Sequence, residues 1–181
     1  MRPPARVALV IAAALALPPV IGAQQSDDTP RASVAPAFSG RYKLVFTVSR
    51  GCPASMQVGP VSVAMDVSEA TVAAGSEVSG RSASPSEVPD NGRFVLLRQG
   101  DRVHGAFGSS SQVLGLVTAE GYLLWMQIMT DGTASTASGG RTRASGTAFG
   151  EVDLALASDP AADSIGNCRG ALDHQWSIEP M

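Results

Sequence analysis

From Phe38 onward, the chain consists of short apolar runs separated by clusters of Gly, Ser, Asp and Pro. The clearest run covers residues 41–49, where every second side chain from Tyr42 to Val48 is apolar. Alternation at a period of two is typical of a half-buried β-strand, because successive side chains point to opposite faces of a sheet. Runs of this kind, bounded by turn-forming residues, predict an all-β domain.

The same pattern recurs along the chain and predicts eight or nine strands with almost no helix. The predicted strands cover residues 41–49, 61–67, 71–78, 93–99, 102–108, 113–118, 122–129, 143–157 and 171–179. Between them, residues 79–92 and 131–140 are rich in Gly and Ser and are predicted to be loops. Because hairpin-sized spacing makes successive strands antiparallel neighbours, we expect a single antiparallel up-and-down β-barrel of about eight strands.

The N-terminal segment has the three parts of a secretory signal peptide. Arg2 and Arg6 precede an uninterrupted apolar run over residues 7–17, which Pro18 and Pro19 end. The expected cut follows the small residue Ala23, with an aliphatic residue two positions before it. The run is shorter than the roughly 20 apolar residues that span a bilayer. We therefore expect residues 1–23 to be a signal peptide and the chain to be exported, to the periplasm or beyond the cell. An uncleaved membrane anchor is the alternative, which the two prolines and the polar stretch around the cut disfavour.

Cleavage leaves a flexible linker over residues 24–38 and one β-barrel domain over residues 39–181. Without Arg2 and Arg6 the chain has 11 basic and 16 acidic residues, a net charge of about −5. This balance argues against nucleic acid as a partner. No other segment is long and apolar enough to span a membrane.

The chain contains two cysteines, Cys52 and Cys168. In an oxidising compartment an isolated pair predicts a disulfide, whereas two free thiols or a metal-binding pair are the alternatives. No Cys-x-x-Cys motif is present, and a zinc site would need further ligands from only two histidines. In the chain-entropy model, closing such a long loop stabilises a fold by about 4–5 kcal/mol.

The cysteine pair also suggests how the barrel closes. If the first and last strands pair antiparallel with the two cysteines opposite each other, Leu44 faces Trp176 and Phe46 faces His174. A slip of one residue would pair apolar side chains with polar ones throughout. We therefore predict that these strands close the barrel, with the disulfide near one rim. The predicted apolar face of the last strand consists of Leu172, His174, Trp176 and Ile178.

The start of the first strand resembles the lipocalins. Gly40, Arg41 and Tyr42 stand where lipocalins carry a Gly-x-Trp motif, with Tyr in place of Trp, and the other lipocalin motifs are not recognisable. The chain also resembles uncharacterised exported bacterial barrels that have a Cys after the first strand and a Cys followed by a His, here Cys168 and His174, in the last. The resemblance covers about residues 39–181, and it implies a lipocalin-like, calycin-type barrel rather than a particular function.

The sequence carries little that predicts catalysis. Its histidines are His104, expected on the outer surface, and His174. Asp173 and His174 are neighbours on a strand and should point to opposite faces, and no Gly-x-Ser-x-Gly elbow is present. We therefore predict a non-enzymatic protein with no metal and no cofactor.

The barrel interior remains as the candidate site. Eight strands enclose a space that side chains either fill or share with one small ligand. We expect an apolar ligand there, and Tyr42, His174 and Trp176 would be its polar contacts. The residues predicted to contact it are Tyr42, Phe46, Met126, His174 and Trp176. The alternative is a filled barrel that serves as an envelope structural or protein-interaction module, in which His174 is a core residue bonded to backbone or water.

Overall fold

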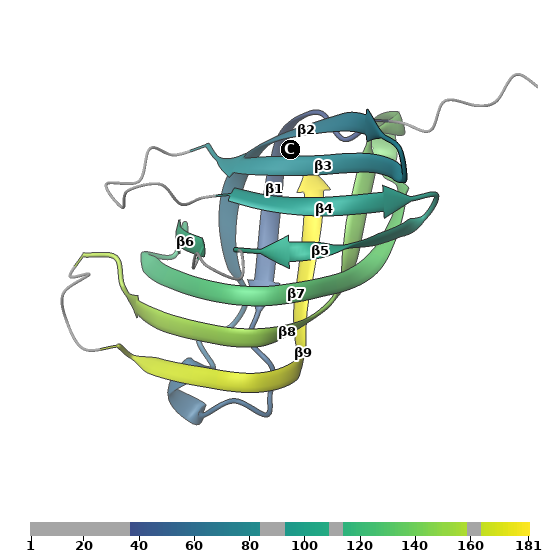
Figure 1. The fold of residues 1–181 in the computed structure, drawn as a ribbon. Helices are drawn as coiled ribbons and strands as arrows, with labels where there is room; N and C mark the ends of the chain where they lie inside the picture. Colours follow the sequence, from purple (N-terminus) through teal and green to yellow (C-terminus); the bar gives the residue numbers. More distant parts are fainter. Residues whose placement is uncertain (1–36, 84–92, 109–113, 159–163) are drawn as a thin grey trace, which may run out of the picture. The chain divides into compact units, whose positions relative to one another are not determined.

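The computed structural model describes residues 37–83, 93–108, 114–158 and 164–181, all within the compact unit Ala35–Met181. They form nine strands and two short 3-10 helices, with no α-helix in these ranges (Figure 1). The strands are β1 (Gly40–Thr47), β2 (Val61–Val72), β3 (Gly75–Ser82), β4 (Arg93–Gln99), β5 (Arg102–Phe107), β6 (Leu114–Val117), β7 (Tyr122–Thr136), β8 (Thr142–Leu156) and β9 (Gly166–Pro180). The 3-10 helices are η1 (Ala54–Met56) and η2 (Ser138–Gly140). The all-β prediction is confirmed.

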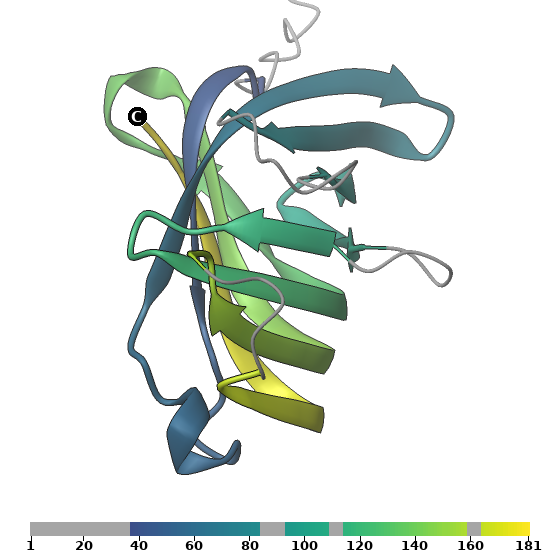
Figure 2. The same cartoon turned by 90° about the vertical axis from the view of Figure 1, so that its left-hand side faces the viewer.

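The strands close into an antiparallel barrel. Their order is β5-β4-β3-β2-β1-β9-β8-β7-β6, and pairing of β5 with β7 completes the ring (Figures 1 and 2). The short β6 pairs with the first part of β7 and β5 pairs with the next part, so eight strands make the wall. The up-and-down barrel is confirmed, and the architecture is consistent with a calycin-like fold.

The pairing of the first and last strands is confirmed, but the predicted register is wrong by two residues. Leu44 lies opposite Ile178, and Phe46 lies opposite Trp176. A shift by an even number keeps every side chain on its face, so the two apolar faces still meet.

The reason for the shift is the path of the chain after β1. The strand ends at Thr47, and the N–H of Cys52 donates to the carbonyl of Ser49 at 3.1 Å in a turn. The residues between strand and cysteine are therefore not extended. The predicted register placed Cys52 opposite Cys168 and treated these residues as extended, which shifted the pairing by two.

Residues 131–140 were predicted to be a loop, and this is wrong for most of them. β7 continues to Thr136 and pairs with β8 along its whole length, which leaves residues 137–141 as the turn. Of the predicted loop over residues 79–92, the first four belong to β3, and residues 84–92 lie outside the described ranges.

A β-bulge between β8 and β9 changes the outward pattern of β9. Gly150 has a φ of +145°, and a Cβ there would lie 2.3 Å from the carbonyl oxygen of Gln127. The two register shifts at Gly150 each place one extra residue in β9, one between Ala171 and His174 and one between Cys168 and Ala171. Leu172, predicted to share the apolar face of His174, is consequently 76% exposed.

The barrel has a turn end and a loop end. The turn end carries the β2–β3, β4–β5 and β7–β8 connections, and the opposite, loop end carries the β1–β2 and β6–β7 connections. At the turn end Phe38 is fully buried, and its N–H donates to the Glu69 carboxylate at 2.7 Å. Arg98 pairs with the same carboxylate at 3.3 Å and lies over the Phe38 ring. Phe38 and this ion pair thus cover the turn end.

At the loop end, the β6–β7 turn is tied to the start of β2. The N–H of Ala119 donates to the Ser62 carbonyl, and the Glu120 carboxylate accepts from both the N–H and the hydroxyl of Ser62 at 2.9 Å. Burial alone would raise the pKa of Glu120, but hydrogen bonds from Ser62, from its own N–H and from Thr118 together lower it. The carboxylate therefore remains ionised and holds the turn in place.

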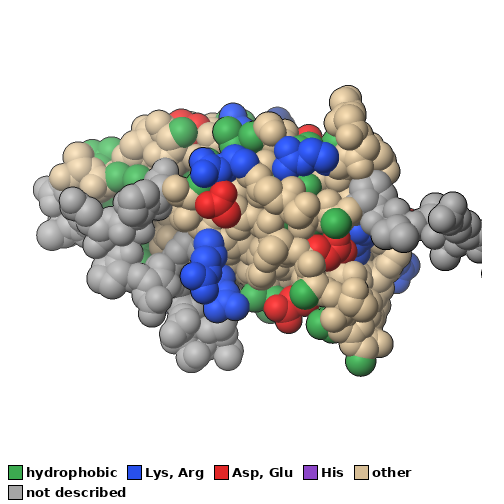
Figure 3. Space-filling view, turned by 90° about the horizontal axis from the view of Figure 1, so that it is seen from above, with side chains coloured by type: hydrophobic (Ala, Val, Ile, Leu, Met, Phe, Trp, Pro, Cys, Tyr) green, Lys and Arg blue, Asp and Glu red, His purple; other side chains and the backbone are tan. Residues whose placement is uncertain are grey.

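The outer surface carries charges of both signs. On the face seen in Figure 3, Lys and Arg side chains are interspersed with Asp and Glu, and hydrophobic side chains are scattered. An exposed ion pair joins Arg41 to Asp66 across β1 and β2 at 2.8 Å. His104 is exposed, as predicted. In the described ranges, no helix combines the length and apolar character that crossing a bilayer requires.

Candidate ligand site in the barrel interior

All five residues predicted to contact a ligand are buried in the barrel core, each at most 2% exposed. They are Tyr42, Phe46, Met126, His174 and Trp176. β1 supplies the first two, β7 supplies Met126, and β9 supplies the last two. The period-two alternation of these strands explains why they share the inner face.

Trp176 fills one cross-section of the interior. It lies opposite Gly146 on β8, which in turn lies opposite Gly132 on β7. A Cβ at Gly132 would lie 2.8 Å from the indole Cζ2, so the missing side chain makes room for the ring. The indole N–H donates to the Thr147 carbonyl at 3.0 Å, and the Phe107 ring meets the indole edge-on, with centroids 5.8 Å apart. The predicted polar group of Trp176 is thus already satisfied.

His174 lies two residues before Trp176 on β9 and is fully buried. Its Nδ1 accepts a hydrogen bond from the backbone N–H of Ser49 at 3.1 Å, and its ring lies beside Phe46, with centroids 5.4 Å apart. Among the described residues, its Nε2 has no hydrogen-bond partner. One ring nitrogen therefore anchors the imidazole, and the other remains available in the core.

The environment of His174 favours the neutral ring. Burial lowers its pKa, while the nearby Asp173 carboxylate and the Gly150 carbonyl oppose this shift without reversing it. The Gly150 carbonyl is thus close to the ring, but it does not form a hydrogen bond of good geometry with Nε2.

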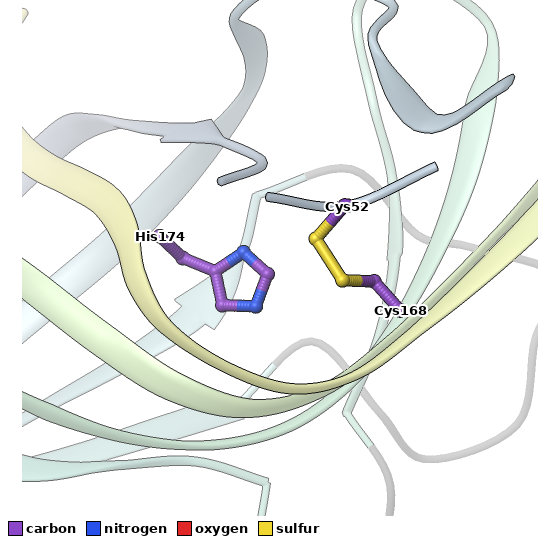
Figure 4. A group of neighbouring side chains, drawn as sticks. All are labelled: Cys52, Cys168 and His174. Carbon is purple, nitrogen blue, oxygen red and sulfur yellow. A yellow bond between two sulfur atoms is a disulfide. The ribbon is translucent and has the colours of Figure 1, made fainter. Parts of the chain in front are cut away.

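The two cysteines form the disulfide predicted from the sequence, with Cα atoms 5.4 Å apart. It lies beside His174 on the same side of the curved β9 ribbon, and the sulfur atoms and a ring nitrogen lie within 4.8 Å of one another (Figure 4). These are metal-ligating residue types, but sulfur atoms joined in a disulfide offer no thiolate to a metal. In this oxidation state the group is an apolar wall for the imidazole.

Ser49, Asp173 and His174 meet at the loop end, but they are not bonded as a catalytic triad. The Ser49 hydroxyl donates to the Asp173 carboxylate, and His174 accepts from the Ser49 backbone. In a Ser-His-Asp triad the histidine accepts from the serine hydroxyl and donates to the aspartate. The contacts position the imidazole rather than activate the serine.

Tyr42 lies apart from the other predicted contacts. Phe46 and Trp176 lie opposite each other on β1 and β9. Tyr42 lies on the turn-end side of this pair, and His174 lies on its loop-end side. The Arg141 guanidinium lies 4.7 Å from the centre of the Tyr42 ring, and no described residue forms a hydrogen bond with the phenol oxygen. Tyr42 and His174 therefore cannot contact the same small polar group.

Sequence reasoning missed Thr130, which is 2% exposed and whose hydroxyl has no hydrogen-bond partner within the described ranges. It lies opposite Ala148 on β8, and Ala148 lies opposite His174 on β9. Extending the alternation of Leu124, Met126 and Ile128 by one step would have found it. The predicted strand ended one residue too early.

Comparisons with family models, with curated proteins and with solved structures give no significant match for this chain. What the chain can do must therefore be argued from its own residues.

Proposed function

We propose that this chain is an exported, lipocalin-like barrel that binds a small, largely apolar ligand in its interior, without catalysing a reaction. The observation that carries the proposal is the Nε2 of His174, which has no hydrogen-bond partner among the described residues and lies in a largely apolar core. A buried polar atom without a partner costs about 1–3 kcal/mol, and most such atoms in folded proteins have one. A ligand with a polar atom would supply the partner.

The position of His174 supports the same proposal. It lies on the loop-end side of the Trp176 indole, whereas the turn end is covered by Phe38. The indole would then be the floor of the site, with Phe46 and Met126 in its wall.

Retention of a neutral apolar fluorophore, N-phenyl-1-naphthylamine, tests the proposal. We expect the purified protein to bind one fluorophore per barrel, with increased emission. Replacing the buried Ala148 by Leu adds bulk between Thr130 and His174 and should weaken binding about ten-fold or more, a change of at least about 1.4 kcal/mol. Ser145→Leu adds the same bulk at an exposed position of β8 and is the matched control.

Each variant must first give a cooperative thermal transition. If Ala148→Leu does not fold, Ala148→Val is the milder substitute. Absence of fluorophore binding by the folded wild-type protein would reject the proposal, as would equal binding by wild type and the Ala148 variant.

A second candidate function rests on an apolar row outside the barrel. Val95, Ala106, Met129 and Phe149 are successive cross-strand neighbours on β4, β5, β7 and β8, and Leu172 follows on β9 beside the bulge. The four large side chains of this outer apolar row are all exposed. Contiguous exposed apolar surface is typical of protein-interaction sites, so the row favours an interaction module.

The fluorophore experiment separates the two candidates. Met129→Ser and Phe149→Ser make the outer apolar row polar without touching the core. If these changes abolish fluorophore binding and Ala148→Leu does not, the apolar site is on the outer surface. Interior binding predicts the reverse.

A further inference from the structure

The unpartnered nitrogen of His174 carries the proton of the neutral ring. Nδ1 accepts a hydrogen bond from the Ser49 N–H, and a nitrogen that accepts cannot itself bear a proton. In the neutral ring the proton must then be on Nε2. His174 therefore carries a buried donor that forms no hydrogen bond of good geometry within the described part of the chain, although the Gly150 carbonyl lies nearby.

Thr130 offers a second group in the same inward row. The row runs from Gly105 on β5 through Thr130 and Ala148 to His174. The Oγ1 hydroxyl of Thr130, like Nε2 of His174, is buried and has no hydrogen-bond partner in the ranges that the structure describes. Side chains on one inner row of a closed barrel converge toward its axis, and Thr130 and His174 are the neighbours of Ala148 on either side in this row. An oxygen with two lone pairs can accept from both.

The charge of the site limits the kind of ligand oxygen that can bind there. His174 is neutral because burial lowers its pKa, and the one carboxylate that raises that pKa, Asp173, points outward and accepts from the Ser49 hydroxyl. Burying a carboxylate beside a neutral ring leaves its charge without a counterion, which is strongly unfavourable. A carbonyl oxygen accepts two hydrogen bonds and carries no net charge.

We propose that His174 Nε2 and the Thr130 hydroxyl bind one carbonyl oxygen, so that the ligand is an apolar ketone, ester or aldehyde rather than a fatty acid. This inference rests on the proposed interior binding function. It adds the chemical class of the ligand and gives Thr130 a binding role.

Competition with the bound fluorophore tests this inference with four probes of matched chain length: 2-undecanone, methyl decanoate, decanoate and undecane. We expect the ketone and the ester to displace the fluorophore, and decanoate to need about ten-fold more, which corresponds to about 1.4 kcal/mol. Binding should also shift the carbonyl stretching band of 2-undecanone to lower wavenumber than in alkane solvent.

Thr130→Val removes the hydroxyl and keeps the shape of the side chain, whereas Thr130→Ser keeps a hydroxyl and is the matched control. We expect Thr130→Val to weaken 2-undecanone about five- to ten-fold, as for loss of one hydrogen bond, and to leave undecane unchanged. His174→Asn can still accept from Ser49 and should produce a similar selective loss, which keeps the test valid if a Thr130 variant fails to fold.

The outcomes separate this inference from the function on which it rests. Fluorophore binding with no preference of ketone over carboxylate, or with no selective effect of the variants, would overturn the carbonyl assignment and leave interior binding intact. Absence of fluorophore binding would overturn both.

Discussion

The backbone N–H of Ser49 donates to Nδ1 of His174 across 125 residues of sequence, at a distance of 3.1 Å. This bond fixes the orientation of the imidazole and places its proton on the nitrogen that faces the core. It also fastens the chain after β1 to β9, next to the disulfide. The properties proposed for the interior depend on it.

The stability of the fold should depend on pH through His174. Its pKa is lower in the folded than in the unfolded chain, where it is near 6.5, so the unfolded chain binds more protons between these two values. The contribution of neutral His174 to the free energy of unfolding is complete above about pH 6.5 and decreases as the pH falls toward the pKa of the folded state. Urea unfolding at several pH values between 8 and 5.5 measures this decrease.

His174→Asn is the control for this pH dependence. It retains an acceptor for the Ser49 N–H but does not titrate in this range, so its unfolding free energy should be nearly constant. An equally steep decrease in the variant would show that another group is responsible.

Removing the disulfide should destabilise the barrel by about 4–5 kcal/mol in the chain-entropy model. The double variant Cys52→Ala and Cys168→Ala removes it without adding polar atoms to the core. Guanidinium unfolding gives the free energies, and a reductant should destabilise the wild type but not the variant. Equal unfolding free energies for the two proteins would contradict this account.

Gly132→Ala should destabilise the barrel by about 1–3 kcal/mol, because overpacking forces side chains and backbone to move. The new Cβ would lie 2.4 Å from the Ser145 carbonyl oxygen and 2.8 Å from the Trp176 ring. Thermal unfolding measures the loss, and tryptophan emission should change. The exposed neighbour Thr133→Ala should stay within about 0.5 kcal/mol of wild type. A Gly132→Ala barrel as stable as wild type would mean that the indole does not occupy this space.

Glu120→Gln should loosen the β6–β7 turn. The substitution replaces two charge-assisted hydrogen bonds to Ser62 by weaker ones, and because Glu120 is exposed we expect a loss of about 1 kcal/mol. The wild-type contribution is present above about pH 4.5 and disappears as the pH falls through the lowered pKa. Amide hydrogen exchange at Ala119, whose N–H donates to Ser62, should be faster in the variant. Unchanged exchange would refute the role of Glu120.

Sequence patterns predicted the strands well where alternation and turn residues coincide. β4 was predicted with its observed bounds, because the turn-forming sequence Asp-Asn-Gly precedes it and Gly-Asp follows it. Residues 131–136 were assigned to a loop because their small and hydroxyl side chains are also typical of loops. Pairing with β8 keeps them extended, and local composition does not reveal that pairing.

The candidate site was predicted only in part, because some of its contacts join segments that are distant in sequence. Burial of His174 and Trp176 followed from alternation along β9 alone. The partner of His174 is a backbone group on a distant segment, and the space for Trp176 comes from a glycine two strands away. Both relationships join residues that are far apart in sequence, so the local sequence pattern does not predict them. Thr130 was missed only because its strand was ended too soon.

The central claim is that an apolar ligand binds inside the barrel, and nuclear Overhauser effects from bound 2-undecanone to methyl groups test it most directly. Binding in the interior predicts contacts to the methyl groups of Ala148 and Thr130. Contacts only to Met129 and Leu172, on the outer apolar row, or no contacts at all at saturating ligand, would contradict the account.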